Sequence, residues 1–457
     1  MKNEKNEKKK TTTEKKDLMS DFKINDQLKK YLNDNKFLKP TEIQKKTIPE
    51  ILKGGDILTI AKTGSGKTLC FLIPIISKIL DDFREEDKLL ALILTPTREL
   101  CVQIYDVLEK LTRKTKIKTC KVIGGIKTKK EKEKVQEAQI LVCTPGRLIQ
   151  HFSELCDFRT EMLDVLVIDE FDKMVELGFK QEVESILEYL PISQRLLFSA
   201  TFKSGDLGQK TVKLENPKII SDFSENKVCH FYRRVGITEK INCLYSILKH
   251  HHKDRKQKTI VFFSTCKAAK FHYLLFSKFF GDAFLLCSSV SQKQRIESYR
   301  SFRSSPGILF CTDVASRGLD FEQVHQVIQF DCPDSAETYI HRSGRTGRNQ
   351  NEGVSYSLLL PEELRLIEFL KNVNLRNTEL AQTDVNLKEM EDFEIKKLDR
   401  KLKGIFRNDK ILREFVGKYC TTYEKYLKIN KKRFPVDSEV EIKKLKEYLG
   451  VRENFTK

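Results

Sequence analysis

Short apolar runs alternate with longer amphipathic segments along most of this chain. Helical patterns separate the runs, an order typical of parallel sheets with helices on both faces. The runs that have the length and composition of buried strands are 56–60, 89–94, 140–143, 165–168 and 195–198 in the first half, and 259–263, 283–286, 307–311, 326–330 and 354–359 in the second. The pattern predicts an α/β protein with two mostly parallel sheets in tandem.

Changes in composition divide the chain into five predicted segments. The polar stretch around Asn216-Pro217 indicates a break between the two halves. From about Asn374, spaced apolar residues among Lys and Glu are typical of amphipathic helices. The predicted segments are a disordered basic tail over 1–20, a first α/β domain over 21–213, a linker over 214–230, a second domain over 231–373 and a helical C-terminal extension over 374–457.

Between the first strand and the helix after it lies a glycine-rich segment. Such a turn points backbone N–H groups and the positive end of a helix dipole at an anion. Lys67 would reach the β- and γ-phosphates of a nucleotide, and the Thr68 hydroxyl would bind Mg²⁺. A glycine-rich turn without a ligand is the alternative. The residues expected to bind the nucleotide here are Ala61, Lys62, Thr63, Gly64, Ser65, Gly66, Lys67 and Thr68.

Three acidic side chains, Asp169, Glu170 and Asp172, follow the run 165–168. At the C-terminal end of a parallel strand a carboxylate can hold the Mg²⁺ shell, and its neighbour can orient the attacking water. We assign Asp169 to the metal and Glu170 to the water. Capping of the following helix is an alternative that explains Asp172 only.

Charge and cysteine content narrow the class of protein. With 84 Lys and Arg against 65 Asp and Glu, the net charge of +19 favours a polyanionic partner such as nucleic acid. No apolar run approaches the ~20 residues of a membrane span, and the first 17 residues are too polar for a signal peptide. The 12 cysteines contain no C-x-x-C pair, which predicts reduced thiols in the cytosol or nucleus and no metal site of their own.

Ordered motifs make the chain resemble the DEAD-box RNA helicases of superfamily 2. The resemblance covers roughly residues 21–360 and implies two tandem RecA-like domains with mostly parallel sheets, followed by a small helical C-terminal extension. The motifs are Phe37 with Pro40-Thr41-Glu42-Ile43-Gln44, then Pro96-Thr97-Arg98-Glu99-Leu100, Gly124-Gly125, Thr144-Pro145-Gly146-Arg147, Asp169-Glu170-Phe171-Asp172, Ser199-Ala200-Thr201, Gln292 with Arg295, and the stretches 312–320 and 341–348.

The resemblance assigns a role to each matching position. Gln44 would read adenine through its amide donor and acceptor, Phe37 would stack on the base, and Asp320 would meet the ribose. Arg345 and Arg348 would reach the γ-phosphate when the domains close and join Lys67, Asp169 and Glu170 as catalytic residues. The expected RNA contacts are Pro96, Thr97, Arg98, Gly124, Gly125, Thr144, Pro145, Gly146, Arg147, Arg295, Thr312 and Arg317. The residues expected to couple ATP to RNA are Asp172, Ser199, Thr201 and His341.

Some positions depart from the family pattern. Phe171 replaces the usual Ala of the name motif, Lys36 replaces a Gly before Phe37, and Cys287-Ser288 stands where many members have His-Gly. These changes remove no phosphate, metal or water ligand. Asp172, where the related D-E-A-H translocases have His, favours the DEAD-box branch.

A narrower resemblance suggests a biological setting. The stretches 141–148 and 329–342, and the segment 415–450, look like the nucleolar branch that remodels small-subunit pre-rRNA and releases a small nucleolar RNA from it. We therefore expect a monomeric, RNA-dependent ATPase that acts in the nucleus, within the nucleolus. Its expected cofactors are ATP and Mg²⁺, and preribosomal proteins are possible partners. The cytoplasm is less favoured as a location.

Two other functions remain open at this point. An ATP-gated RNA clamp would share every motif but turn over slowly, and a DNA-directed translocase would be stimulated by DNA. In the extension, Lys428, Lys431, Lys432 and Arg433 lie beside Tyr426 and Phe434. They suggest either a cationic and aromatic surface for RNA or a helical pack that only shields the second domain.

Overall fold

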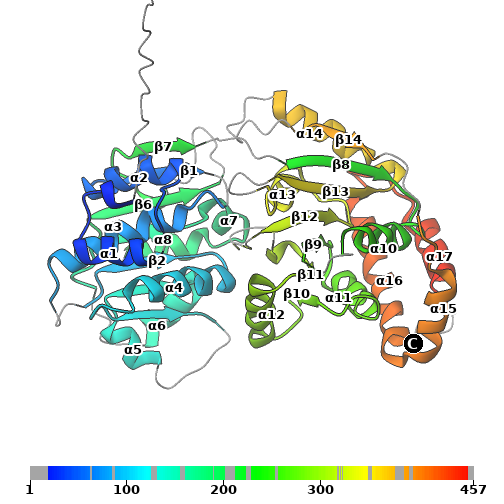
Figure 1. Cartoon of the computed structure of the whole chain (residues 1–457), viewed down its shortest axis with the longest axis horizontal. Coiled ribbons are helices and arrows are strands. Elements are labelled where there is room, and N and C mark those ends of the chain that lie inside the picture. Colours follow the sequence, from blue (N-terminus) through cyan, green and yellow to red (C-terminus); the bar gives the residue numbers. More distant parts are fainter. Residues whose placement is uncertain are drawn as a thin grey trace, which may run out of the picture.

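The chain forms two α/β units in tandem, with further helices against the outer side of the second unit (Figure 1). Each unit contains a seven-stranded, all-parallel sheet, which confirms the predicted fold class. The computed structural model describes residues 19–35, 37–61, 64–84, 88–124, 131–154, 160–188, 190–200, 211–222, 228–252, 256–315, 319, 321, 323–347, 352–375, 385–390 and 395–450.

The first sheet has the strand order β3-β4-β2-β5-β6-β1-β7. Its strands are β1 (Ile57–Ala61), β2 (Ala91–Leu94), β3 (Thr119–Val122), β4 (Ile140–Cys143), β5 (Val165–Ile168), β6 (Gln194–Ser199) and β7 (Lys218–Asp222). The bounds of β4 and β5 agree with the sequence prediction, whereas β3 and β7 were not predicted. Strand β7 lies within the segment expected to be a linker. There Asn216-Pro217 precedes the strand, and β7 pairs with β1 at the edge of the sheet.

Alternate residues of β1 face opposite sides of this sheet, as the strand period of two requires. Ile57 and Ala61 belong to a core with the helices of residues 26–112, and Leu58 and Ile60 belong to a core with the helices of residues 131–188. The helices are η1 (Met19–Asp21), α1 (Asp26–Asp34), α2 (Glu42–Leu52), α3 (Lys67–Asp81), α4 (Arg98–Thr112), α5 (Glu131–Glu137), α6 (Pro145–Glu154), α7 (Phe171–Glu176) and α8 (Lys180–Glu188).

The second sheet repeats this plan in the order β10-β11-β9-β12-β13-β8-β14. Its strands are β8 (Val228–Arg234), β9 (Lys258–Phe262), β10 (Ala283–Leu286), β11 (Gly307–Cys311), β12 (Val324–Gln329), β13 (Gly353–Leu359) and β14 (Leu387–Glu389). The bounds of β10 and β11 agree with the prediction. Strands β8 and β14 were not predicted, and β14 lies in the extension, where we expected helices only. It continues the sheet beyond β8.

Helix α12 covers one face of the second sheet, and other helices cover the opposite face. Ile260 and Phe262 share a core with Tyr299 and Phe302 of α12, while Val261 lies in the core of the opposite face. The helices of this domain are α10 (Lys240–His251), α11 (Cys266–Phe276), α12 (Gln292–Ser304), η2 (Asp313–Ala315), α13 (Ala336–Ser343), η3 (Pro361–Leu364) and α14 (Arg365–Leu375).

The C-terminal extension belongs to the core of the second domain. It contains α15 (Asp399–Asn408), α16 (Lys410–Asn430) and α17 (Ser438–Tyr448). Tyr419 of α16 stacks on Phe271 of α11 with ring centroids 4.6 Å apart and planes 7° from parallel. Phe434, which one of the two alternatives placed at an aromatic RNA surface, is only 2% exposed. For this residue the structure favours the other alternative, a helical pack against the second domain, because its ring lies in the core that the extension completes.

No helix in the described part of the chain is both long and apolar enough to cross a membrane.

Candidate active site

The phosphate loop connects β1 to α3 and requires glycine at two positions. Gly64 and Gly66 have φ of 82° and 96°, in the left-handed region that side chains disfavour. A Cβ on Gly66 would lie 2.5 Å from Nε2 of Gln44. A side chain at position 66 would therefore displace the Gln44 amide, in addition to straining the backbone. Lys62 and Thr63 lie outside the described residues.

Gln44 ties the adenine-reading motif to the phosphate loop. Its Nε2 donates to the Gly66 carbonyl at 3.0 Å, and its Oε1 accepts the Thr41 N–H at 2.9 Å. A primary amide has two N–H groups and a carbonyl with two lone pairs, so one donor and one acceptor remain for an adenine edge. Phe37, on the loop before α2, is 37% exposed and thus offers a ring face to solvent. Asp320 lies outside the described residues.

The polar groups around the loop suit a nucleotide with Mg²⁺. Lys67 begins α3 and is 7% exposed, and its Nζ donates to the Ala61 carbonyl. Among the described residues, the buried Ser65 Oγ has no hydrogen-bond partner. Its hydroxyl is therefore free to donate a hydrogen bond to a bound phosphate. The Thr68 hydroxyl and the Asp169 carboxylate are oxygen ligands of the kind that Mg²⁺ prefers.

Asp169 and Glu170 follow β5, at the same edge of the sheet as the phosphate loop. Each is 3% exposed, and Oδ1 of Asp169 accepts the Glu170 N–H at 3.0 Å. Burial raises the pKa of both carboxyls, and the nearby Lys67 ammonium opposes the rise. In the part of the chain that the structure describes, Oε2 of Glu170 has no hydrogen-bond partner. This oxygen is available to accept a hydrogen bond from water.

Phe171 is a core residue directly after Glu170. It begins α7, is 6% exposed and shares a core with Ile168 and Met174. Glu170 before it has φ of 52° and ψ of 53°, a conformation that is uncommon for residues other than glycine. The large aromatic side chain is therefore held in the core directly after the residue that carries the water-orienting carboxylate.

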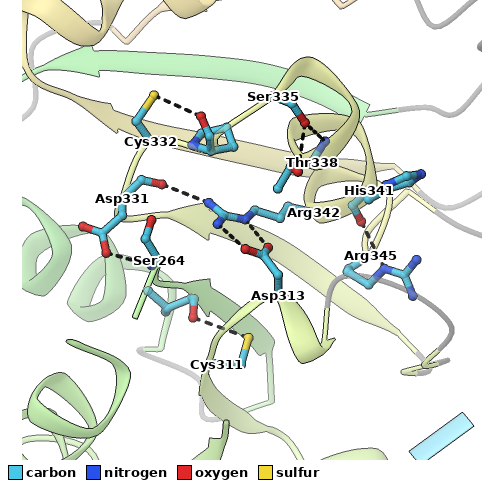
Figure 2. A network of polar contacts seen from close by, with 12 residues as sticks. Ser264, Cys311, Asp313, Asp331, Cys332, Ser335, Thr338, His341, Arg342 and Arg345 are labelled. Carbon is cyan, nitrogen blue, oxygen red and sulfur yellow. Dashed lines mark hydrogen bonds and ion pairs between the residues drawn. The ribbon is translucent and has the colours of Figure 1, made fainter. Parts of the chain in front are cut away.

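The second domain contributes a buried arginine, Arg345, near the end of α13 (Figure 2). Arg345 is 1% exposed; its Nε donates to the His341 carbonyl at 3.2 Å and its Nη1 to the Leu319 carbonyl at 2.5 Å. The positive charge of Arg345 lowers the pKa of Glu170, against the larger effect of burial. The structure thus places Lys67, Asp169 and Glu170 at one site, with the charge of Arg345 near enough to act on Glu170, whereas Arg348 lies outside the described residues.

Arg342 holds the segment that carries Arg345, a role that the sequence did not predict. Its Nε and Nη2 donate to the two carboxylate oxygens of Asp313 at 2.6 and 2.8 Å, and its Nη1 donates to the Asp331 carbonyl at 3.0 Å. The guanidinium therefore clamps α13 to η2 and to the end of β12 (Figure 2).

Helices α4 and α12 join the two domains. Arg295 of α12 forms an ion pair with Glu99 at 2.8 Å, and Gln292 donates to the same carboxylate at 3.0 Å. Gln292 also accepts from Arg98 at 3.4 Å. Arg98 and Arg295 were predicted to contact RNA, and the structure adds that both take part in the interdomain contact.

The contact continues along both helices beyond the recognised motifs. The Tyr299 hydroxyl donates to Gln103 at 3.2 Å, and Arg300 pairs with Asp106 at 3.2 Å. On α4 the residues Glu99, Gln103 and Asp106 are four and three positions apart, a spacing that places them on one helix face. This spacing of polar residues is visible in the sequence and could have indicated a contact surface on α4. It does not identify the residues of α12 that bind there.

Several predicted RNA contacts also have structural roles. The Thr97 hydroxyl caps α4 by accepting the Leu100 N–H at 3.3 Å. Arg147 lies near the start of α6 and pairs with Glu131 at 2.8 Å. A Cβ on Gly124 would lie 3.1 Å from Nη2 of Arg98, so glycine allows the guanidinium to pack there.

The other predicted residues have the following places. Pro96 is buried between β2 and α4, Pro145 and Gly146 begin α6, and Thr144 and Thr312 are 9% and 8% exposed after β4 and β11. Ser199 and His341 are buried, and Asp172 is partly exposed. Gly125, Thr201 and Arg317 lie outside the described residues.

Comparisons with known proteins agree with this site. Residues 41–207 match the model of the DEAD/DEAH box helicase, and residues 239–350 match that of the helicase conserved C-terminal domain. The chain is 40% identical over 444 residues to ATP-dependent RNA helicase DBP4 of Encephalitozoon cuniculi, covering 94% of this chain and 98% of that protein. It is 37% identical over 432 residues to probable ATP-dependent RNA helicase DDX10 of Homo sapiens, covering 91% of this chain and 48% of the human protein.

Among solved structures, Mss116p with its NTE and C-tail deleted, bound to ssRNA and AMP-PNP, superposes with a TM-score of 0.79 at 25% identity. The superposition covers 94% of this chain and 88% of the Mss116p chain. Both halves of the chain and the extension therefore take part in the likeness. The chain belongs to the DEAD-box family of ATP-dependent RNA helicases.

Proposed function

We propose that this helicase uses ATP and Mg²⁺ to open short RNA duplexes during small-subunit pre-rRNA processing. The observation that carries the catalytic part is the contact between the two domains, where Arg295 of α12 and Glu99 of α4 form an ion pair at 2.8 Å. Glu170 of the first domain is influenced by the charge of Arg345 of the second. Hydrolysis would then require closure of the domains, and closure is the step that bound RNA can favour.

Each site residue has a separate proposed role in ATP hydrolysis. Bound Mg²⁺ would be held by Thr68 and Asp169 and would neutralise charge on the β- and γ-phosphates. Lys67 and the N–H groups of the loop would hold the phosphates. Glu170 would orient the attacking water and accept its proton, and Arg345 would stabilise the charge that develops as the terminal phosphoryl group departs.

The α4–α12 contact links this chemistry to RNA. It includes Arg98, a predicted RNA contact, and Arg98 packs against Gly124, another such residue. An RNA strand bound through sugar and phosphate along this side would contact both domains and stabilise the closed arrangement. Closure would bend the bound strand and release its complement, with little selection for base sequence.

The biological setting rests on the resemblance of 141–148, 329–342 and 415–450 to the nucleolar branch of the family, together with the net charge of +19. From it we propose pre-rRNA and a small nucleolar RNA as substrates, preribosomal proteins as partners, and a monomer acting in the nucleolus. The decisive experiment is crosslinking of the protein to RNA in its own cells, followed by sequencing of the fragments. Enrichment of small-subunit pre-rRNA supports the proposal, and its absence contradicts it.

A second experiment separates the competing activities. ATPase stimulation is measured with RNA and DNA of one sequence, and strand displacement is followed in a single turnover. We expect stimulation by RNA alone and displacement of a short duplex. Stimulation by DNA would favour the translocase, and tight ATP-dependent RNA binding without displacement would favour the clamp.

A further inference from the structure

Tyr426 connects the C-terminal extension to the arginine-bearing segment of the second domain. From α16, its hydroxyl donates to the Cys332 carbonyl at 2.6 Å and also bonds the Ser264 side chain. Its ring stacks on that of Tyr423, with centroids 5.9 Å apart and planes 14° from parallel. Burial raises the pKa of Tyr426 above its ordinary value, so the hydroxyl keeps its proton and donates at neutral pH.

Cys332 lies in the loop between β12 and α13, and neighbouring contacts fix the same loop. Oδ2 of Asp331 accepts the Ser264 N–H at 2.9 Å, and the Asp331 carbonyl accepts from Arg342 at 3.0 Å. Figure 2 shows Ser264, Asp331 and Arg342 around this loop. Tyr426 adds a contact from the C-terminal extension, which lies outside the residues 41–207 and 239–350 that match the helicase models.

The loop determines where α13 begins. Ser335 caps the helix by accepting the Thr338 N–H at 3.1 Å. At the other end of α13, the His341 carbonyl accepts from Nε of Arg345 at 3.2 Å. Displacement of the loop would therefore move α13, and with it Arg345, which is bonded to the last turn of that helix.

We propose that Tyr426 is a positioning residue for the ATPase reaction. Its hydroxyl holds the loop 331–335, and through that loop it sets the places of Arg342 and Arg345. The inference rests on the proposed function, because it makes a helix of the extension part of the apparatus that hydrolyses ATP. Tyr426 itself touches neither substrate nor reacting atoms.

Tyr423 provides a matched control. It lies on the same face of α16, about one helical turn before Tyr426, and its ring stacks between those of Tyr419 and Tyr426. Its hydroxyl is buried and has no hydrogen-bond partner among the described residues. Tyr423→Phe and Tyr426→Phe thus remove the same atom from the same aromatic stack, but only Tyr426→Phe removes a hydrogen bond to the loop.

The experiment compares both variants of the full chain with the wild type. Amide hydrogen exchange is measured over 331–345, and kcat and KM for ATP are measured with saturating RNA. We expect Tyr426→Phe to exchange faster in this segment and to lose about tenfold in kcat, the size of one net hydrogen bond, with KM for ATP within about twofold. Tyr423→Phe should match the wild type in both measurements.

Three outcomes would overturn the inference. Unchanged exchange in Tyr426→Phe would mean that the hydroxyl does not hold the loop. Faster exchange with unchanged kcat would mean that Arg345 does not depend on the loop. Equal effects of the two substitutions would indicate general packing of α16. If the wild type shows no RNA-stimulated hydrolysis, the proposed function fails, and the inference about the ATPase fails with it, while exchange still reports whether Tyr426 holds the loop.

Discussion

Glu99 of α4 and Arg295 of α12 form a nearly dry ion pair that joins the two domains. Their charged groups are 2.8 Å apart, and the Glu99 and Arg295 side chains are 0% and 14% exposed. A buried charge without its partner is strongly unfavourable. Because the partners belong to different domains, the pair stabilises the arrangement in which α4 and α12 are in contact.

Arg295→Ala should therefore oppose closure. It leaves the Glu99 carboxylate buried without a cationic partner, and breaking such an ion pair costs about 3–5 kcal/mol. We expect RNA-stimulated kcat/KM to fall by at least ~10², with nucleotide affinity in the absence of RNA unchanged. The matched control is Arg300→Ala on the same helix, because Arg300 is 56% exposed and its pair with Asp106 contributes little. Equal losses in the two variants would contradict a special role for the buried pair.

Lys67→Ala and Glu170→Gln should fail at different steps. Without its ammonium the loop should bind ATP weakly, since Lys67 is assigned to the phosphates. Glu170→Gln should still bind ATP and RNA but lose at least ~10² in turnover, the usual contribution of a general base. Equilibrium binding of ATP and steady-state hydrolysis separate the two effects, and Lys78→Ala on the exposed side of α3 is the control. An unchanged rate in Glu170→Gln would refute the water-orienting role.

Arg345→Ala should affect turnover far more than binding. The residue comes from the second domain and stabilises charge only when the domains close, so RNA-stimulated kcat should fall by as much as ~10³ to 10⁵. ATP affinity should change little. The exposed Arg365 provides a control of the same chemistry. If hydrolysis without RNA falls by the same factor, the two-domain model of the site is wrong.

The parts of the site that could be predicted from the sequence are those formed by residues adjacent in the chain. The loop 61–68 and the acids 169–172 are contiguous, so spacing alone indicates their roles. Pairs such as Arg295 with Glu99 join residues far apart in the chain, and no local pattern selects one carboxylate among many. Strand β8 lies next to the edge strand β14, and with His230, Arg233 and Arg234 among its residues it lacks the continuous hydrophobic run of a central strand.

His272 should make the protein sensitive to acid. Its ring is buried in α11 against Phe263 and Phe330, at centroid distances of 4.6 and 4.4 Å. Burial lowers the pKa of His272 from 6.5 to about 3. In the unfolded chain the imidazole gains a proton below about pH 6.5, so its contribution to stability is present above that pH and declines toward pH 3.

The test is the free energy of unfolding at pH 7.5 and pH 5.5 for the wild type and His272→Phe. Between these values the wild type should lose about 1.4 kcal/mol more than the variant, as expected for one proton. His250→Phe is the control, because His250 is exposed. Parallel losses in the wild type and His272→Phe would show that His272 is not the neutral group inferred from its burial.

The cations that follow α16 allow a test of whether the C-terminal extension binds RNA through charge alone. Lys431, Lys432 and Arg433 are exposed, whereas the neighbouring Phe434 is buried and the Tyr426 hydroxyl is bonded to Cys332. Any contribution of this surface to RNA binding should therefore be electrostatic. Substitution of the three cations by Ala should weaken RNA binding and reduce the slope of log K against log salt by roughly 0.7 for each phosphate that the surface no longer neutralises.

The matched control removes three exposed cations elsewhere on the extension. Arg400, Lys401 and Lys403 of α15 are all exposed, so their replacement by Ala changes the net charge by the same amount. We expect a larger change in salt slope for the 431–433 variant than for the α15 variant, with ATP affinity preserved in both. Equal changes would indicate a diffuse effect of net charge. An unchanged slope in both would leave the 431–433 surface with a structural role or a protein partner, because binding to phosphates releases counterions in proportion to the number of phosphates neutralised.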